Sequence, residues 1–259
     1  MDIVLLGSGN VATHFGKALS HAGHRIVQVY SRDLAHAAVL ADALNTSAID
    51  DLATVDPAAD VYLIAVKDDA IGQVAAQLPA SLKGAVVHTA GSVEMNILAL
   101  QARTYGVIYP VQTFSVAKPV YFSEVPLALE ASDEITYTRL AELAASLSIR
   151  VFPCDSRQRL ALHMAAVFAC NFTNHLYAIG AAILREHALD FDLIRPLILE
   201  TAEKVMEHQP EDVQTGPAVR HDTGTIQKHL AALNGRPDLA ALYQLISDHI
   251  NHPQVISSK

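Results

Sequence analysis

The chain has 259 residues, of which 51% are hydrophobic and 17% charged, and its formal net charge is −9. This length allows one or two domains, and an acidic balance without a basic stripe argues against nucleic acid or an anionic membrane surface as partners. Two cysteines, Cys154 and Cys170, are too few for a disulfide framework or a cysteine metal site. We therefore expect no metal and, with no signal peptide ahead of the first strand, a cytoplasmic location.

The first sixteen residues combine a short apolar run, a glycine-containing turn and a helix-like stretch. Gly7 lets the chain turn sharply off the strand, and Gly9 has no side chain to hold a pyrophosphate away from the backbone. Ala12 keeps the following helix close to the sheet. The first backbone N–H groups of that helix then face the phosphates. The pattern predicts a dinucleotide-binding βαβ unit.

The second predicted strand, residues 25–30, ends at Ser31 and Arg32. NAD-specific folds usually place a carboxylate here to accept hydrogen bonds from the ribose 2′-hydroxyl, and that carboxylate would repel a 2′-phosphate. A hydroxyl followed by a guanidinium suits the phosphate instead. The pair predicts NADP as cofactor, the alternative being a solvated loop arginine.

The rest of the first half alternates strands and helices. A helix is expected at 34–44. A strand at 61–66 is apolar at nearly every position, ends at Val66 and runs into a loop that begins with Lys67. Strands at 84–89 and 106–109 open into loops at 90–92 and 110–115. These loops should share the carboxyl edge of the sheet with the glycine turn, where open α/β folds bind ligands. A helix at 133–147 lies between two last strands, at 125–129 and 149–152.

From residue 155 onward only helical patterns remain, at 156–187, 192–208, 223–233 and 237–250. The expected fold is therefore a doubly wound parallel sheet in residues 1–153 followed by an all-α domain in residues 154–259. The apolar stretch 160–184 is long enough to raise the question of a membrane span. Because it contains His163, Asn171, Thr173 and Asn174, we expect a buried helix instead.

The long helix carries polar residues at informative spacing. At about 100° per residue, Asn174 lies about 20° from His163 around the axis and Asn171 about 80° away. Burying these groups unpaired would cost a few kcal/mol in total, so they either satisfy each other and the backbone or face a wet cleft. We interpret them as lining a substrate site.

A second candidate site lies in residues 215–225. Arg220 is suited to a substrate carboxylate, and Thr225 and His229, four residues apart, share a helix face. The alternative is structural: Asp222 or Thr223 caps the helix and the glycines belong to a loop.

Hydride transfer to a C=O or C=N group requires a positioned nicotinamide, a proton donor and a substrate anchor. His163 is the first candidate for the donor because imidazole titrates near neutral pH, and His88 is the second. Asn171, Asn174 and Ser92 would orient the substrate, with Arg220 as its carboxylate anchor.

Motifs along almost the whole chain carry a family resemblance: GSGNVA, VYSRD, LIAVKDDAI, VVHTAGS, YPVQTFS, HMAAVFACNFTNHLY and TGPAVRHDTGTIQKHL. With them the chain resembles the bacterial NADP oxidoreductases that pair a Rossmann-like domain with a C-terminal helical domain of unknown function. These belong to the grouping of 6-phosphogluconate dehydrogenase and pyrroline-5-carboxylate reductase. The cofactor contacts expected are Gly7, Ser8, Gly9, Asn10, Val11, Ser31, Arg32, Val66 and Lys67.

The resemblance also implies a homodimer formed through the helical domain. The TGPAVRHDTGTI stretch is similar in place to the stretch that holds substrate in pyrroline-5-carboxylate reductase, where a partner subunit assists.

One position departs from the hydroxyacid dehydrogenases of this grouping, which use a lysine one helical turn before an asparagine. Here Val167 precedes Asn171 by one turn, and no lysine occurs between Lys118 and Lys204. The expected function is NADP-dependent hydride transfer with a small, carboxylated carbonyl or imine compound. The alternatives are a ketopantoate-type reductase with a substitute proton donor, a non-catalytic NADP-binding sensor or scaffold, which the missing lysine favours, and reduction of a deazaflavin.

Overall fold

The structure is a computed structural model that describes residues 1–115 and 118–251. Its first part is an eight-stranded sheet with the order β3-β2-β1-β4-β5-β6-β7-β8. The strands are β1 (Asp2–Leu6), β2 (Arg25–Tyr30), β3 (Ser47–Ile49), β4 (Val61–Ile64), β5 (Ala85–His88), β6 (Tyr105–Pro110), β7 (Leu127–Ala131) and β8 (Val151–Pro153).

The strands from β3 to β6 run parallel, as expected, so the loops that follow β1, β2, β4, β5 and β6 share one edge of the sheet. The other end of the sheet differs from the expectation of parallel strands throughout. β7 pairs antiparallel to β6, and β8 pairs parallel to β7. The sheet is thus Rossmann-like and mostly parallel, with two reversed strands at one side.

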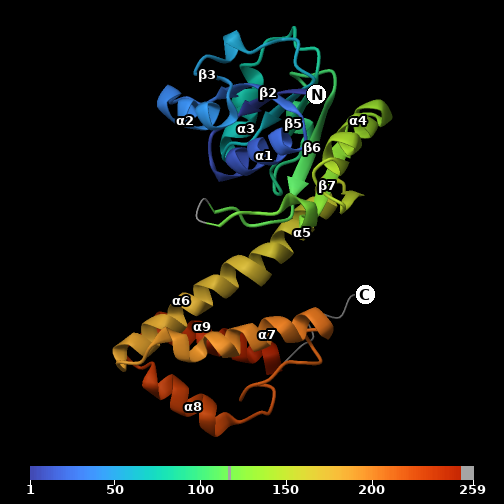
Figure 1. Cartoon of the computed structure of the whole chain (residues 1–259). Coiled ribbons are helices and arrows are strands. Elements are labelled where there is room, and N and C mark those ends of the chain that lie inside the picture. The colour runs from blue at the N-terminus through green and yellow to red at the C-terminus, as the bar shows by residue number, and fades with distance from the viewer. Residues whose placement is uncertain (116–117, 252–259) are drawn as a thin grey trace. The chain divides into compact units, whose positions relative to one another are not determined.

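Helices cover both faces of the sheet (Figure 1) because both faces of its central strands are apolar. Ile3 and Leu5 of β1 pack on the side of α1 (Asn10–His21), α2 (Leu34–Leu44) and α4 (Glu134–Ala145). Val4 and Leu6 face the opposite side, with α3 (Ile71–Ala76). This double burial fixes the sheet edge that carries the glycine turn.

A long helix follows β8 and runs from Ser156 to Glu186 in three segments. These are α5 (Ser156–Ala166), a π-helical segment (Val167–Phe172) and α6 (Thr173–Glu186). The remaining helices are α7 (Arg195–Glu207), α8 (Thr223–Ala232) and α9 (Pro237–Asn251). All four helices expected after residue 155 are present, and α7 begins three residues late because a short 3-10 helix occupies Phe191–Ile194.

Contacts divide the chain into two compact units, Met1–His175 and Leu176–Lys259. The division falls inside the long helix, whereas the expected domain boundary at 153/154 coincides with the end of β8. Within the described residues, this helix is long and apolar enough to cross a membrane by length and composition, with a mean hydropathy of 1.3 in its most apolar window. None of that window is buried, so the expected burial of the helix is not met within a single chain.

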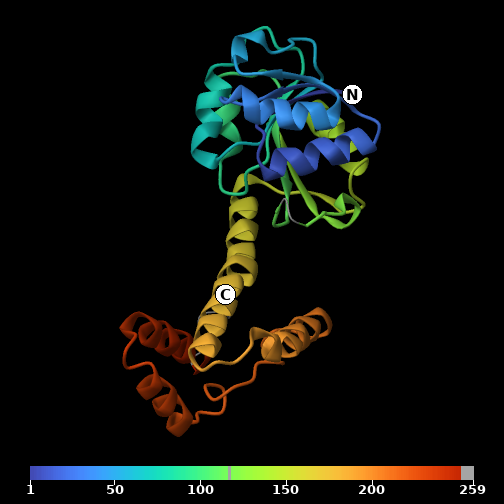
Figure 2. The ribbon, with the colours of Figure 1, turned by 60° about the vertical axis from the view of Figure 1, so that its left-hand side comes forward.

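The second unit does not enclose a core of its own. Between residues 176 and 251 only Ala218, Ile226 and Ser247 are buried. Figure 2 shows the orange and red helices of this unit spread apart. Large apolar side chains are left exposed, among them Leu193 at 65% and Met206 at 84%. A folded domain normally buries far more apolar surface to offset its loss of conformational entropy.

Candidate functional site

The turn between β1 and α1 has the backbone geometry that a pyrophosphate requires. Gly7 has φ +136°, and a Cβ there would lie 2.3 Å from the carbonyl oxygen of Ala65. Gly9 is the extended N-cap of α1, no side chain caps the helix, and a Cβ at Gly9 would meet no atom within 4 Å. The first N–H groups of α1 are therefore without a side-chain cap, and the space beside Gly9 is open, as phosphate binding at a helix N-terminus requires.

The loop that follows β6 is tied to the first turns of α1. The Asn10 side-chain amide donates to the carbonyl of Phe114 at 3.1 Å, and His14 Nε2 lies 3.0 Å from the carbonyl of Ser115. The Asn10 amide group, expected to contact the cofactor, thus holds this loop beside the glycine turn. Ser8 and Val11 are half-buried in the same turn.

The end of β2 presents Ser31 and Arg32 as expected. Asp33, the next residue, uses its carboxylate to cap α2 by accepting from the Ala35 N–H at 2.9 Å. Arg32 is exposed and Ser31 is half-buried. Val66 and Lys67 follow β4 at the same edge, half-buried and exposed respectively. The end of β2 thus offers a hydroxyl and a guanidinium, two groups that suit a 2′-phosphate.

His163 on α5 lies against the carboxyl ends of β5 and β6. Its Nδ1 is 3.2 Å from the hydroxyl of Tyr109 on β6, and the two rings meet edge to face with centroids 6.0 Å apart. Gly91, just beyond β5, packs directly on the imidazole. The first-choice proton donor is therefore held at the sheet edge that carries the nucleotide turn.

A buried polar cluster anchors α5 to the sheet. Arg159 is 1% exposed, forms an ion pair with Glu130 of β7, and donates to the carbonyl of Val93 at 2.6 Å. Ser156 donates to Glu130 at 2.7 Å and accepts from the N–H of Met95 at 3.1 Å. These bonds fix the position of the helix one turn before His163.

His88 lies at the end of β5 and is fully buried. Its Nδ1 accepts from the N–H of Ala90 at 3.2 Å. Burial, and secondarily the nearby charge of Arg159, lower the pKa of His88 to about 3. The ring is therefore neutral near pH 7, which makes His88 a poor proton donor and leaves His163 as the stronger candidate.

The other predicted residues of the first unit do not form one cluster. Ser92 donates to the carboxylate of Asp68, which brings together the loops after β4 and β5. Asn171 and Asn174 are exposed. Asn171 lies in the π-helical segment, where each residue advances by less than 100° because hydrogen bonds join residues i and i+5. The predicted offset of Asn174 from His163, which assumed a regular α-helix, is therefore wrong.

In the second unit, the structure shows the helix cap that the alternative for residues 215–225 expected. Asp222 is the N-cap of α8 and accepts from the N–H and hydroxyl of Thr225, at 3.0 and 2.7 Å. These hydrogen bonds lower the pKa of Asp222. His229, one turn after Thr225, has its Nδ1 2.8 Å from the Tyr243 hydroxyl, and Arg220 is exposed.

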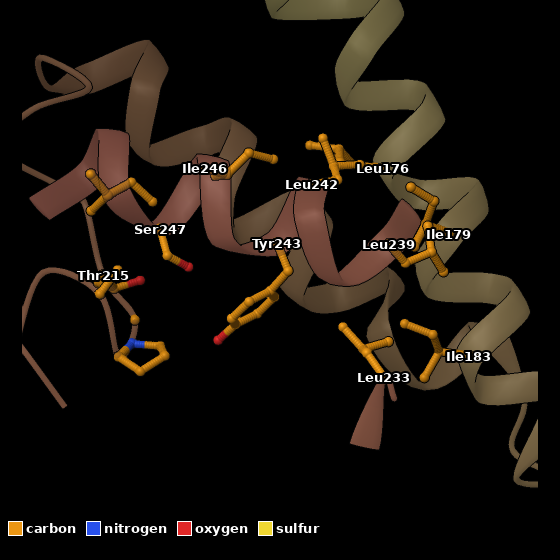
Figure 3. Close-up of a pocket in the computed structure, with 14 residues that line it drawn as sticks. Leu176, Ile179, Ile183, Thr215, Leu233, Leu239, Leu242, Tyr243, Ile246 and Ser247 are labelled. Atoms are coloured by element: carbon orange, nitrogen blue, oxygen red, sulfur yellow. The ribbon is translucent and has the colours of Figure 1, made fainter. Parts of the chain in front are cut away.

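The loop ahead of α8 also borders a pocket of about 240 Å³ in this unit. Gly216, with φ +112°, turns the chain between Thr215 and Pro217, which both line the pocket. Figure 3 shows aliphatic side chains of α6 and α9 along one wall, with the hydroxyl groups of Thr215, Tyr243 and Ser247 together at one side. Among the described residues, those that line the pocket are all uncharged.

Sequence reasoning missed four residues that define the site in the first unit: Tyr109, Gly91, Asp68 and Arg159. Tyr109 and Gly91 occur in motifs that the sequence singled out, but no spacing rule connects them to a helix more than fifty residues later in the chain. The available signal was an arginine, Arg159, near the start of a long apolar helix, since an arginine that packs with such a helix requires a polar partner.

Comparison with known proteins places the two parts of the chain in defined families. Residues 2–90 match the family described as NADP oxidoreductase, coenzyme F420-dependent. Residues 125–250 match a domain of unknown function, DUF2520. A solved structure named as an NADP oxidoreductase, from Bacteroides fragilis, is 44% identical, with a TM-score of 0.88 over 96% of this chain and 97% of that one. The chain belongs to this NADP oxidoreductase family. Its cofactor is accordingly NADP, and the glycine turn with Ser31 and Arg32 fits that nucleotide.

More distant structures share the fold. Pyrroline-5-carboxylate reductase from Streptococcus pyogenes is 15% identical, with a TM-score of 0.65 over 97% of this chain and 96% of that one. A reductive aminase from Aspergillus terreus, in complex with NADPH and ethyl levulinate, is 15% identical, with a TM-score of 0.72 over 96% of this chain and 93% of that one. No curated protein matches the chain.

Proposed function

We propose that this NADP oxidoreductase reduces the C=O or C=N group of a small, carboxylated compound, with His163 as the proton donor. The observation that carries the proposal is the position of His163, fixed by Tyr109 and Gly91 at the same sheet edge as the nucleotide turn. When bound, NADPH supplies the hydride. His163 donates a proton from Nε2 to the substrate oxygen or nitrogen, so that hydride and proton together complete the reduction.

The remaining expected residues have supporting roles in this proposal. Ser92, Asn171 and Asn174 orient the substrate by hydrogen bonds, and Arg220 pairs with its carboxylate. Thr225 and His229, which both lie on α8, are further substrate-binding residues in this proposal, although the Thr225 hydroxyl already donates to Asp222. The fold likeness to a reductive aminase and to pyrroline-5-carboxylate reductase supports an imine as the substrate class.

We also propose that the active form is a homodimer joined through the helical unit. Its support is the near absence of buried residues between 176 and 251, because a second copy would cover the exposed apolar side chains. The two free cysteines, Cys154 and Cys170, together with the use of NADPH, support a cytoplasmic location.

The test is a fluorescence titration of the purified protein with NADPH and NADH, repeated with Arg32→Ala and, as control, with the exposed Arg150→Ala. We expect NADPH to bind much more tightly than NADH, and Arg32→Ala alone to weaken NADPH binding about tenfold, as for one lost charged contact. Equal binding of both nucleotides in wild type and mutant would overturn the role of Arg32.

Turnover is then measured with 2-keto acids, five-membered cyclic imines and coenzyme F420, the last because the match over residues 2–90 carries that coenzyme in its description. NADPH oxidation by a keto acid or imine that is lost in His163→Gln supports the proposed reaction. Tight NADPH binding without any turnover would favour a sensor. Oxidation of NADPH by coenzyme F420 alone would mean that the substrate is this coenzyme and not a keto acid or an imine.

A further inference from the structure

The imidazole of His163 is held from two sides by residues of the sheet. Tyr109 is 8% exposed, lies one residue before the end of β6 and is paired with Ala128 of β7. Its hydroxyl lies 3.2 Å from Nδ1 of His163, and the rings are inclined at 79°. The contact joins a rigid strand to the helix that carries the candidate proton donor, so it defines where the ring can lie.

Gly91 is the second residue that fixes the position of the His163 imidazole. A Cβ at position 91 would lie 2.8 Å from each of Cβ, Cγ and Nδ1 of His163. Such distances are too short for any side chain, so the backbone after β5 must be glycine for the imidazole to occupy this place. Any larger residue would push the ring away from the Tyr109 hydroxyl as well.

A phenol hydroxyl is well suited to hold a histidine that gains and loses a proton. It accepts from Nδ1–H when the ring is an imidazolium, and it still accepts from Nδ1–H in the neutral ring that is left after Nε2 has given up its proton, so the contact persists in both states. With Nδ1 engaged, only Nε2 is free to face a substrate. We propose that Tyr109 and Gly91 are positioning residues that fix the ring orientation of His163 and present Nε2 to the substrate.

The groups around this contact keep Tyr109 in its neutral form. The charged groups that act on its hydroxyl are Arg159 on α5 and Asp68 on the loop after β4, with Cys154 nearby. Burial raises the pKa of Tyr109, with the charge of Arg159 acting in the opposite direction. The phenol therefore stays neutral, and its oxygen can accept from Nδ1–H before and after the proton transfer.

The assignment of roles rests on the proposed function, but the geometry is testable without turnover. In the full chain labelled with ¹⁵N-histidine, the ring signals of His163 are identified by their loss in His163→Gln. We expect Tyr109→Phe and Gly91→Ala each to shift the Nδ1 resonance of His163. Two matched controls should leave it in place: Tyr105→Phe, on the same strand, and Gly235→Ala, where a Cβ meets no atom within 4 Å.

Kinetics supply the second readout, with a five-membered cyclic imine or a 2-keto acid as the probe. Tyr109→Phe should lower kcat about tenfold while KM changes less than twofold, because substrate contacts are intact and only the donor is misplaced. An unmoved Nδ1 resonance in both Tyr109→Phe and Gly91→Ala would overturn the positioning role. If the resonance moves but no probe is reduced, the positioning stands and the proposed reaction fails.

Discussion

His88 makes the stability of this protein depend on pH. Its pKa is about 3 in the folded chain, mainly because of burial, whereas an unfolded histidine titrates near pH 6.5. The unfolded state therefore binds the extra proton first, and the stability present above pH 6.5 is lost progressively as the pH falls toward 3. Between pH 6.5 and 5 this residue alone should lower the free energy of unfolding by about 2 kcal/mol.

Urea unfolding at pH 7.5 and 5.0 measures this effect. The variant is His88→Asn, whose side-chain oxygen can still accept from the N–H of Ala90, and the control is the exposed His36→Asn. We expect the loss of stability at pH 5.0 to shrink by about 2 kcal/mol in the first variant and to be unchanged in the control. The same loss in wild type and His88→Asn would contradict the assignment.

Arg159 is expected to contribute to the stability of the fold rather than to the reaction. Its guanidinium is 1% exposed, and its partner Glu130 is 17% exposed, so truncation would leave a mostly buried carboxylate unpaired. We expect Arg159→Met to lower the free energy of unfolding by about 3 kcal/mol. Arg157→Met, two residues away and exposed, is the matched control and should change it by less than about 0.5 kcal/mol. Equal midpoints and slopes for the two variants in urea would show that the ion pair contributes nothing.

The sequence predicted single residues well where a local rule applied, and poorly where tertiary contacts decide. Ser31 and Arg32 follow a strand end at a fixed distance from the glycine turn, so their place could be predicted. Tyr109 and Arg159 act through partners far away in the chain, and His88 and His163 look alike in sequence although only His88 is fully buried. Burial is a property of packing, which spacing does not encode.

At the scale of elements, two glycines of the β1–α1 turn have different roles: Gly7 is required for folding, and Gly9 for nucleotide binding. Gly7→Ala forces φ +136° on a residue with a Cβ that would lie 2.3 Å from a backbone oxygen, so it should destabilise the fold by about 3 kcal/mol. Gly9 has φ −78°, which any residue adopts, and open space around it. Gly9→Ala should therefore keep the thermal midpoint but weaken NADPH binding about tenfold, since its methyl group occupies the place of the pyrophosphate. Unaltered NADPH affinity in Gly9→Ala would exclude the phosphate from this turn.

Some elements are too short or too irregular to be predicted from a sequence pattern. The strands and helices of the βαβ repeats could be predicted because their apolar periodicity is long. β3 has three residues and α3 has six, too few for a period to show. The reversed direction of β7 leaves no trace in its composition, and the apolar pattern of residues 156–187 does not distinguish the π-helical segment from the α-helix on either side of it. The error about Asn174 follows from that segment.

For the whole molecule, the distribution of burial predicts the state of assembly. The sheet unit has a continuous core on both faces, whereas the helical unit buries only three residues of its described part. We expect light scattering after gel filtration to give a dimer of twice 27.8 kDa. Apolar side chains of α7 and α9 remain exposed in the single chain, among them Leu197 at 64% and Leu245 at 57%.

The double variant Leu197→Glu, Leu245→Glu should then dissociate or unfold in its helical unit, because a dimer would have to bury both carboxylates. Ile135→Glu is the control, since Ile135 is 77% exposed on α4 of the sheet unit, and it should remain a dimer. The helix 156–186, whose most apolar window is unburied, allows one other outcome, in which wild type sediments with lipid vesicles. A lipid-free monomer with full NADPH binding, or vesicle association, would each contradict the dimer, because in neither case does a second copy cover this surface.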